Sequence, residues 1–230
     1  MCPAKGTSPE TILRLSRQLP TALITRYIAG ADVDYVGADN ELGARRATEH
    51  LVERGHRRIA FIGGSNDSSA RQDRMSGLIS ILEKHGIPLD ESLVVSSAIT
   101  RNGGYTAIQE VLSSANPPTA VLCYNDVVAF GVMLGLRRCN LEPGRDVAVV
   151  GFDDVNEASL WNPPLSSVSA TPTQMGLHAA RLLLKRIEQP DLPTRQVILP
   201  STLTIRASSK FSYKAPSKTM SLPVKPVRRE

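Results

Sequence analysis

The sequence predicts an α/β protein built around a doubly wound parallel sheet, and two observations support that prediction. Short runs rich in Val, Ile and Leu alternate with amphipathic segments along most of the 230 residues. The apolar runs are continuous rather than alternating, as expected of strands that helices cover on both faces. Repeated strand–helix–strand units of this kind are typical of doubly wound sheets.

Five apolar runs are expected to be strands, and the segments between them are expected to be helices. The expected strands are 21–28, 58–64, 92–98, 119–126 and 147–154. The expected helices are 8–19, 41–55, 74–86, 104–114 and 127–139. Ser8 and Pro9 provide a helix start, because serine caps well and proline suits the first helical position. Further along, 173–188 is predicted to be a helix and 195–208 extended chain.

Composition and charge exclude several classes of protein. The chain is 41% hydrophobic and 21% charged, which is ordinary for a soluble globular protein, and no apolar run is long enough to span a membrane. Of 27 basic and 22 acidic residues, six basic and one acidic lie in 210–230, so 21 of each remain in the rest. We therefore expect a neutral body and a disordered basic tail over 210–230, and the net charge of +5 does not indicate a nucleic-acid-binding face.

The sequence shows no pattern typical of catalysis, metal binding or a bound cofactor. The three cysteines and four histidines lack the spacing of a zinc site or a disulfide framework. There is no Gly-x-Ser-x-Gly elbow, and FIGGSNDSS lacks the lysine of a phosphate-binding loop. We therefore expect neither an enzyme, a metal site nor a cofactor. Scattered cysteines and the absence of a signal-peptide core at the N-terminus favour the cytoplasm.

Polar side chains follow several of the expected strands, where doubly wound sheets bind ligands. Arg71 and Arg74 stand three apart at a helix start, and Arg74 can present its fork to hydroxyls or a carboxylate. Asn125 offers a donor and an acceptor, and Asp153 offers two acceptor oxygens. Such a set suits a polyhydroxylated small molecule. The alternative, that these residues cap helices and satisfy loops, is equally compatible with the spacing.

Six stretches of the chain carry a resemblance to a known family. They are EHLVERGHRRIAFIGG (49–64), ARQDRMSGL (70–78), PPTAVLCYNDVVAFG (117–131), DVAVVGFDD (146–154), NPPLSSV (162–168) and LPSTLTIRAS (199–208). In this order the chain resembles the effector-binding domain of LacI/GalR-type bacterial transcriptional regulators. The resemblance implies a periplasmic-binding-protein type I fold, in which three chain crossovers join two α/β subdomains.

Mapped onto this chain, the resemblance divides it into four segments. Residues 1–38 would form part of the N-terminal subdomain and 39–165 the C-terminal subdomain. Residues 166–208 would return to the N-terminal subdomain and make the final crossover, and the tail follows. The family's helix-turn-helix and the first strands and helices of its N-terminal subdomain are missing from this sequence, so we expect that subdomain to be incomplete.

The resemblance also assigns ligand-binding positions. Arg74 matches the family's pocket arginine, and Arg71 matches a second ligand-facing arginine of some members. Asn125 matches the asparagine of an Asn-Asp motif, and Asp153 matches the pocket aspartate of a Gly-aromatic-Asp-Asp motif. Ile99 stands where members often carry an aromatic residue that stacks on the ligand. These five positions are the expected ligand-binding residues.

Two departures bear on the identity of the ligand. Ile99 offers weaker stacking than an aromatic ring, which makes a purine or another flat ring less favoured. Thr25 stands where an Ile-Asp-Arg motif usually has aspartate, so one acceptor for ligand hydroxyls is lost.

By this resemblance the chain is expected to be the effector-sensing and dimerisation portion of a regulator or repressor of transcription. Its ligand would be a small polar molecule such as a sugar or a derivative. A homodimer would form through the apolar helices 74–86 and 104–114, and DNA would be bound by the family's helix-turn-helix, which this sequence lacks. The alternatives are a sugar-binding receptor of an uptake system, which shares the fold, and an inert product of a disrupted reading frame.

Overall fold

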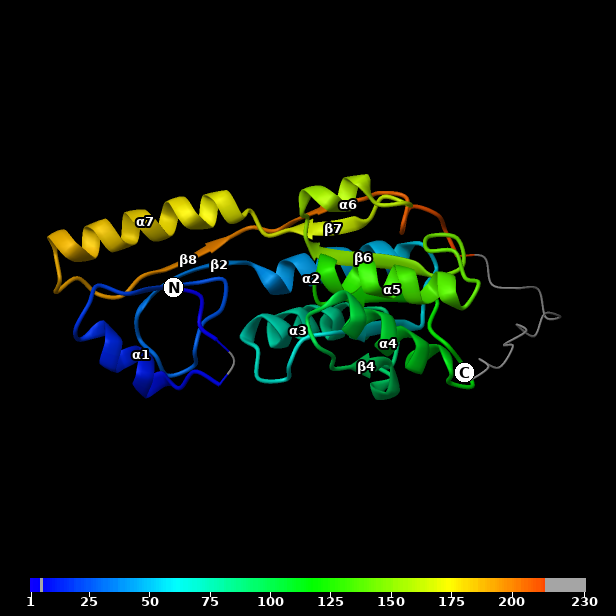
Figure 1. The fold of residues 1–230 in the computed structure, drawn as a ribbon, viewed down its shortest axis with the longest axis horizontal. Coiled ribbons are helices and arrows are strands. Elements are labelled where there is room, and N and C mark those ends of the chain that lie inside the picture. The colour runs from blue at the N-terminus through cyan, green and yellow to red at the C-terminus, as the bar shows by residue number, and fades with distance from the viewer. Residues whose placement is uncertain (5, 214–230) are drawn as a thin grey trace.

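The chain forms two lobes, each built on its own sheet, in a computed structural model that describes residues 1–4 and 6–213 (Figure 1). The sheet of the larger lobe has the order β4-β3-β5-β6-β7-β9, and the sheet of the smaller lobe has the order β1-β2-β8. All neighbouring strands are parallel except the pair β7 and β9. The doubly wound α/β architecture predicted from the sequence is thus confirmed.

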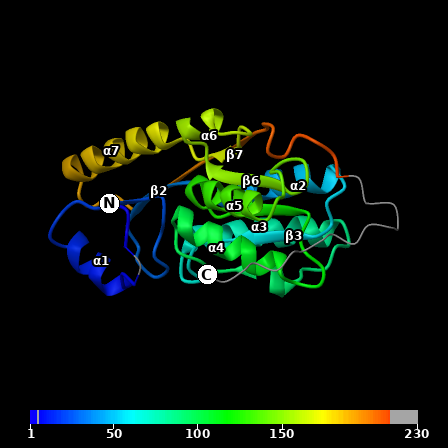
Figure 2. The same ribbon diagram turned by 45° about the vertical axis from the view of Figure 1, so that its right-hand side comes forward.

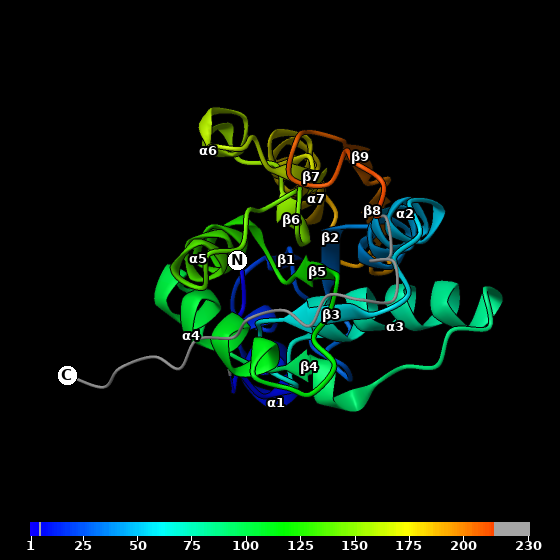
Figure 3. The ribbon, with the colours of Figure 1, turned by 90° about the vertical axis from the view of Figure 1, so that its right-hand side faces the viewer.

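The larger lobe holds most of the regular elements. Its strands are β3 (Ile59–Ile62), β4 (Val94–Val95), β5 (Ala120–Cys123), β6 (Ala148–Asp153), β7 (Ser166–Ser169) and β9 (Thr202–Thr204). Its α-helices are α2 (Asn40–Glu53), α3 (Ser69–Lys84), α4 (Arg101–Leu112), α5 (Asp126–Arg138) and α6 (Asn156–Leu160), with a 3-10 turn at Glu91–Leu93. Seen end-on, α2 and α3 cover one face of the sheet, and α4 and α5 cover the other (Figure 3).

Burial explains why the strands of this lobe are continuously apolar. Every residue of β3 and β5 is buried, because each strand packs side chains against helices on both faces. One core joins β5 and β6 to α4 and α5 around residues such as Phe130 and Met133. The other joins them to α2 and α3 around Phe61 and Phe152.

The smaller lobe is a thinner structure. Its elements are α1 (Pro9–Ser16), β1 (Ala22–Ile24), β2 (Asp34–Ala38), α7 (Pro172–Glu188) and β8 (Gln196–Leu199). Ile12 of α1 packs with Leu23 on one side of the sheet, and Met175 of α7 packs with Val36 on the other. The outer edge of β1 meets the backbone of Met1, whose carbonyl accepts from the Ile24 amide at 2.9 Å.

Three short connections join the lobes, as the resemblance implied. The chain crosses from β2 to α2 at Asp39, from β7 to α7 at residues 170–171, and from β8 to β9 at residues 200–201. Figures 1 and 2 show β2 and β8 running from the smaller lobe toward the larger one. β7 and β9 both belong to the sheet of the larger lobe, so the return expected over 166–208 enters the smaller lobe only after Ser169.

The first residues of the expected tail contact α2. The Tyr213 amide donates to the Arg54 carbonyl at 2.9 Å, and the Tyr213 ring lies 5.4 Å from that of His56. Residues 210–213 of the expected tail therefore have a defined place beside the end of α2, and the rest of that tail, 214–230, lies outside the described residues. None of the helices in the described ranges is long and apolar enough to cross a membrane.

Two glycines set the distance between α4 and α5. A Cβ atom on Gly104 would collide with the Val128 carbonyl, and one on Gly131 would collide with the Arg101 carbonyl. Backbone lies directly against backbone at these positions, so neither neighbour can move aside as a flexible side chain would. The helix pair, and the core beneath it, therefore depends on the absence of side chains at both sites.

We expect Gly131→Ala to lower the free energy of unfolding by roughly 1–3 kcal/mol, because an added methyl has no room there. Gly176→Ala in α7 is the control, since no atom lies within 4 Å of a Cβ built there. It should raise stability by about 0.5–1 kcal/mol through helix propensity. Urea unfolding followed by circular dichroism measures both, and equal effects of the two variants would contradict the packing argument.

Candidate functional site

The Arg74 side chain lies at the centre of the candidate site and is almost completely buried. Its Nε donates to Asn40 Oδ1 at 3.0 Å, its Nη1 donates to the Tyr124 carbonyl, and its Nη2 lies 3.9 Å from Asp153 Oδ1. The guanidinium also stacks over the Phe152 ring at 3.6 Å from the centroid. A buried guanidinium is tolerated because these acceptors and rings replace water.

Asp153 and Asn125 complete the set around Arg74. Asn125 caps α5, where its Oδ1 accepts from the Val128 amide at 3.1 Å, and its side chain lies close enough to the Asp153 carboxylate to favour the ionised form. Burial raises the pKa of Asp153, although Arg74 and Asn125 favour the ionised form. The Asp153 side chain is still 41% exposed, so its oxygens remain available to a hydroxyl donor. Three of the five expected residues therefore lie together at the ends of β5 and β6.

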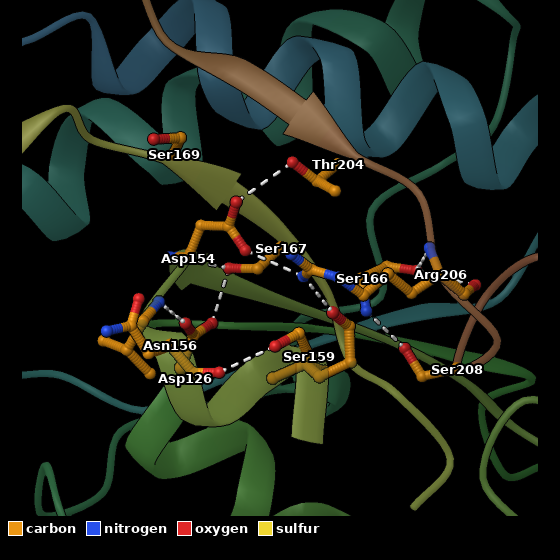
Figure 4. Close-up of polar contacts among 12 residues, drawn as sticks. Asp126, Asp154, Asn156, Ser159, Ser166, Ser167, Ser169, Thr204, Arg206 and Ser208 are labelled. Carbon is orange, nitrogen blue, oxygen red and sulfur yellow. Dashed lines mark hydrogen bonds and ion pairs between the residues drawn. The ribbon is translucent and has the colours of Figure 1, made fainter. Parts of the chain in front are cut away.

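The turn that carries Asp153 has a strained backbone. Asp153 has a φ of 103° and Asp154 a φ of 51°, a region that L-residues seldom adopt. Side chains from β7, β9 and the residues after β9 hold the turn in place (Figure 4). The Asp154 carboxylate accepts from Thr204 Oγ1 at 3.0 Å and from Arg206 Nη1 at 2.7 Å, and the Asp154 amide donates to Ser167 Oγ. Strain of this kind persists only where the surroundings over-determine the conformation.

Asp126 is a buried carboxyl directly beneath this turn (Figure 4). Its Oδ1 accepts from Ser167 Oγ at 2.5 Å and its Oδ2 accepts from the Val155 amide at 2.9 Å. Burial, together with the neighbouring carboxyls of Asp153 and Asp154, raises the pKa of Asp126 to about 7 despite these two hydrogen bonds. Nothing in the sequence spacing points to this residue, because its carboxyl is buried only in the folded chain.

Arg71 and Ile99 lie apart from this set. The Arg71 Nε donates to the Gly63 carbonyl at 3.1 Å, and its side chain lines a shallow hollow along α3 with Met75 and Ile79. Ile99 is 43% exposed just before α4. Within the described ranges, no hydrogen bond or ion pair joins either residue to Arg74, Asn125 or Asp153. The ligand-facing roles of these two residues stay predictions from the resemblance.

The smaller lobe contributes side chains to the same region that the sequence did not single out. Tyr27 OH donates to Asp73 Oδ1 at 3.1 Å, which joins the loop after β1 to α3. The Tyr35 ring on β2 meets the Tyr27 ring edge-on at 5.7 Å. The Asp73 carboxyl and the Arg74 guanidinium are close enough to affect each other's pKa, so this contact lies beside the candidate site. No cluster of three metal-ligating side chains occurs among the residues that the structure describes.

Comparisons with known proteins identify the family. Residues 48–209 match the periplasmic binding protein-like domain family. The ribose operon repressor of Escherichia coli K12 is 30% identical over 91% of this chain and 63% of its own length. The regulator CelR of Thermobifida fusca is 37% identical over 76% of this chain and 52% of its own length. The chain belongs to the periplasmic binding protein-like domain family.

Solved structures agree with that assignment. The complex of CelR with cellobiose aligns with a TM-score of 0.77 at 35% identity, over 82% of this chain and 58% of that one. A LacI-family regulator of Enterococcus faecalis with bound ribose aligns with a TM-score of 0.82 at 26% identity, over 93% and 77%. The chain spans about three fifths of the length of the ribose repressors that it matches.

The buried Asp126 predicts a pH-dependent stability with a definite sign. Because the pKa is raised in the folded state, the native protein binds a proton that the unfolded chain releases between about pH 4 and pH 7. Its contribution therefore falls as pH rises through that window. Asp126→Asn cannot ionise, its side-chain oxygen can still accept from the Val155 amide, and its NH2 group can donate to Ser167 Oγ. The stability of this variant relative to the parent should therefore rise from pH 5 to pH 8.

Urea unfolding of both proteins at the two pH values measures this difference. Taking the difference between variant and parent removes the contribution of His50 and His56, whose burial lowers the pKa of each to about 4. That contribution has the opposite sign, since stability from a histidine buried in its neutral form is lost as pH falls. A variant-to-parent difference that stays constant from pH 5 to pH 8 would show that Asp126 is already ionised in the native state.

Proposed function

We propose that this chain is the effector-sensing and dimerisation portion of a LacI-type transcriptional regulator, and that it binds a sugar or a sugar derivative where the two lobes meet. The observation that carries the proposal is the joining of Arg74, Asp153 and Asn125 at the ends of β5 and β6. Relatives point the same way, because solved LacI-type structures similar to this chain hold cellobiose or ribose.

The arrangement suits recognition rather than catalysis. Arg74 is fixed by protein acceptors, while Asp153 leaves carboxylate oxygens exposed to accept ligand hydroxyls. The similar proteins are named as regulators, so a receptor of an uptake system is the less favoured alternative, and we place the protein in the cytoplasm.

Signalling would follow from the two-lobed fold. A ligand that contacts both lobes favours one angle between them, and a regulator reads that population shift as a change in DNA affinity. The family resemblance assigns DNA binding to a helix-turn-helix, and not to the candidate ligand-binding residues Arg71, Arg74, Ile99, Asn125 and Asp153. Three short connections, at Asp39, 170–171 and 200–201, are the positions that would absorb the change of angle.

The helices expected to form the dimer contact, 74–86 and 104–114, overlap α3 and α4, and apolar residues in them such as Leu78 and Ile108 are buried against their own sheet. Exposed apolar side chains lie instead on α5 and α6, where Leu134 is 41% and Leu160 is 83% exposed. We propose that α5 and α6 form the contact in a homodimer.

A thermal-shift screen against ribose, xylose, glucose, cellobiose and their phosphates tests ligand binding. A ligand that binds only the folded state raises the melting temperature in a dose-dependent way. We expect a shift with at least one sugar, and we expect Asp153→Asn to abolish it because an acceptor is lost. Asp191→Asn on the surface after α7 is the matched control. The absence of a shift with every compound, from a protein that melts cooperatively, would refute sugar sensing by this chain.

Light scattering tests the dimer. We expect a mass of two chains at tens of micromolar, and Leu160→Asp should give monomer because it places a charge in the contact. Leu184→Asp is the control, since Leu184 is 61% exposed on α7, which belongs to the smaller lobe. A monomeric parent protein would refute the dimer, and dissociation by Leu184→Asp alone would place the contact on the other lobe.

A further inference from the structure

Two side chains from opposite lobes meet beside the candidate site. Tyr27 follows β1 in the smaller lobe and Asp73 lies in the first half of α3 in the larger lobe, and their hydrogen bond is 3.1 Å long. The Tyr27 side chain is 38% exposed and Asp73 is half-buried. The contact is therefore accessible from solvent, unlike the buried bonds of Arg74.

Asp73 has the surroundings of a ligand-binding carboxylate. The nearby Asn40 and Arg74 side chains favour its ionised form, whereas Glu41 on α2 disfavours it. Burial is the largest influence and raises the pKa of Asp73. A carboxylate has room for about four hydrogen bonds, so the Tyr27 phenol and the Asn40 amide leave acceptor capacity unused.

Tyr27, which contacts Asp73, packs against Tyr35, and Tyr35 is buried in the core of the smaller lobe. Their rings meet edge-on at 5.7 Å, and Tyr35 OH donates to the Thr25 carbonyl at 3.4 Å. Thr25 itself has a φ of 73°, so the chain turns sharply there and brings Tyr27 toward α3. The Asp73 carboxylate and the phenol rings of Tyr27 and Tyr35 therefore lie near Thr25, the position where the family usually has an aspartate.

We propose that Asp73 is a specificity-determining acceptor for a ligand hydroxyl, that the Tyr27 phenol occupies this acceptor in the ligand-free protein, and that the ligand is an uncharged sugar. The proposal rests on the proposed function and narrows its ligand. A sugar hydroxyl replaces the phenol as donor to the same carboxylate, so one O–H···O bond is exchanged for another of the same kind. Tyr27, once released, offers ring surface to the apolar face of the sugar.

Charge excludes phosphorylated and acidic sugars from this place. The Arg74 guanidinium is flanked by the carboxyls of Asp73 and Asp153, and its Nε and Nη1 donors are already directed at Asn40 and Tyr124. The phosphate or carboxylate of such a ligand would be repelled by the carboxylates of Asp73 and Asp153, and the one guanidinium between them, Arg74, is already shared by both. An uncharged sugar brings hydroxyl donors, which both carboxyls accept.

Calorimetric titration of the full chain tests the proposal. The probes are ribose, xylose, glucose and cellobiose, compared with ribose 5-phosphate, glucose 6-phosphate and glucuronate. We expect an uncharged sugar to bind best. Asp73→Asn should weaken it by about 10-fold or more, as expected for loss of a hydrogen bond to a charged group. Tyr27→Phe should tighten it, because the competing donor is removed. Asp191→Asn should stay within about 2-fold of the parent, as is usual for surface sites.

The opposite signs separate ligand recognition from a merely structural contact. If the Tyr27–Asp73 bond only held the lobes together, both variants would change affinity in the same direction, and that result would overturn the proposal. Unchanged affinity in Asp73→Asn, or a preference for a phosphorylated or acidic sugar, would overturn it as well, while the proposed function would stand. No binding of any probe by a folded parent protein would refute the proposed function itself, and the inference with it.

Discussion

The buried Arg74 guanidinium joins three separate parts of the chain. It binds Asn40 at the first crossover, the Tyr124 carbonyl at the end of β5, and Asp153 at the end of β6. Removing any one partner would leave a buried charge less well compensated, so these strand ends are held in a fixed relation. The Arg74 guanidinium therefore fixes the positions of the acceptor groups that surround it.

The turn after β6 is held from the opposite side. Asp153 and Asp154 have positive φ values, and the Asp154 carboxylate is bound by Thr204 and Arg206, which belong to the chain after the last crossover. The segment that returns from the smaller lobe thus fixes the residue next to the candidate ligand acceptor. A movement of the chain at the final crossover is coupled to the position of Asp153 through the Arg206–Asp154 ion pair and the Thr204 hydroxyl.

Local sequence patterns predicted the larger lobe well and the smaller lobe less well. Continuous apolar runs located β3, β5 and β6 because both faces of these strands are buried. The strand expected over 21–28 ends at Ile24, since Thr25 adopts a left-handed conformation that nothing in its residue type indicates.

Prediction of the candidate site from the sequence was limited by the distance between its residues along the chain, and not by their residue types. Strand-end reasoning found Arg74, Asn125 and Asp153, which the fold brings together. Helical spacing also grouped Arg71 with these residues. In the fold the Arg71 side chain donates to the Gly63 carbonyl, and its ligand-facing role stays a prediction. Tyr27 and Asp73 are 46 residues apart and in different lobes, so only the folded chain shows that they meet.

The single tryptophan of the chain, Trp161, follows α6 and stacks on Phe130 of α5 with ring centroids 4.4 Å apart. The smaller lobe contains no tryptophan, so indole fluorescence comes from one lobe alone. Fluorescence excited in the indole band will change when the packing between Trp161 and Phe130 is lost. It will not report the unfolding of β1, β2 and α7. Far-ultraviolet circular dichroism sees helices of both lobes. Comparison of the two signals along one denaturation curve therefore distinguishes a chain that unfolds as a unit from one whose lobes come apart in sequence.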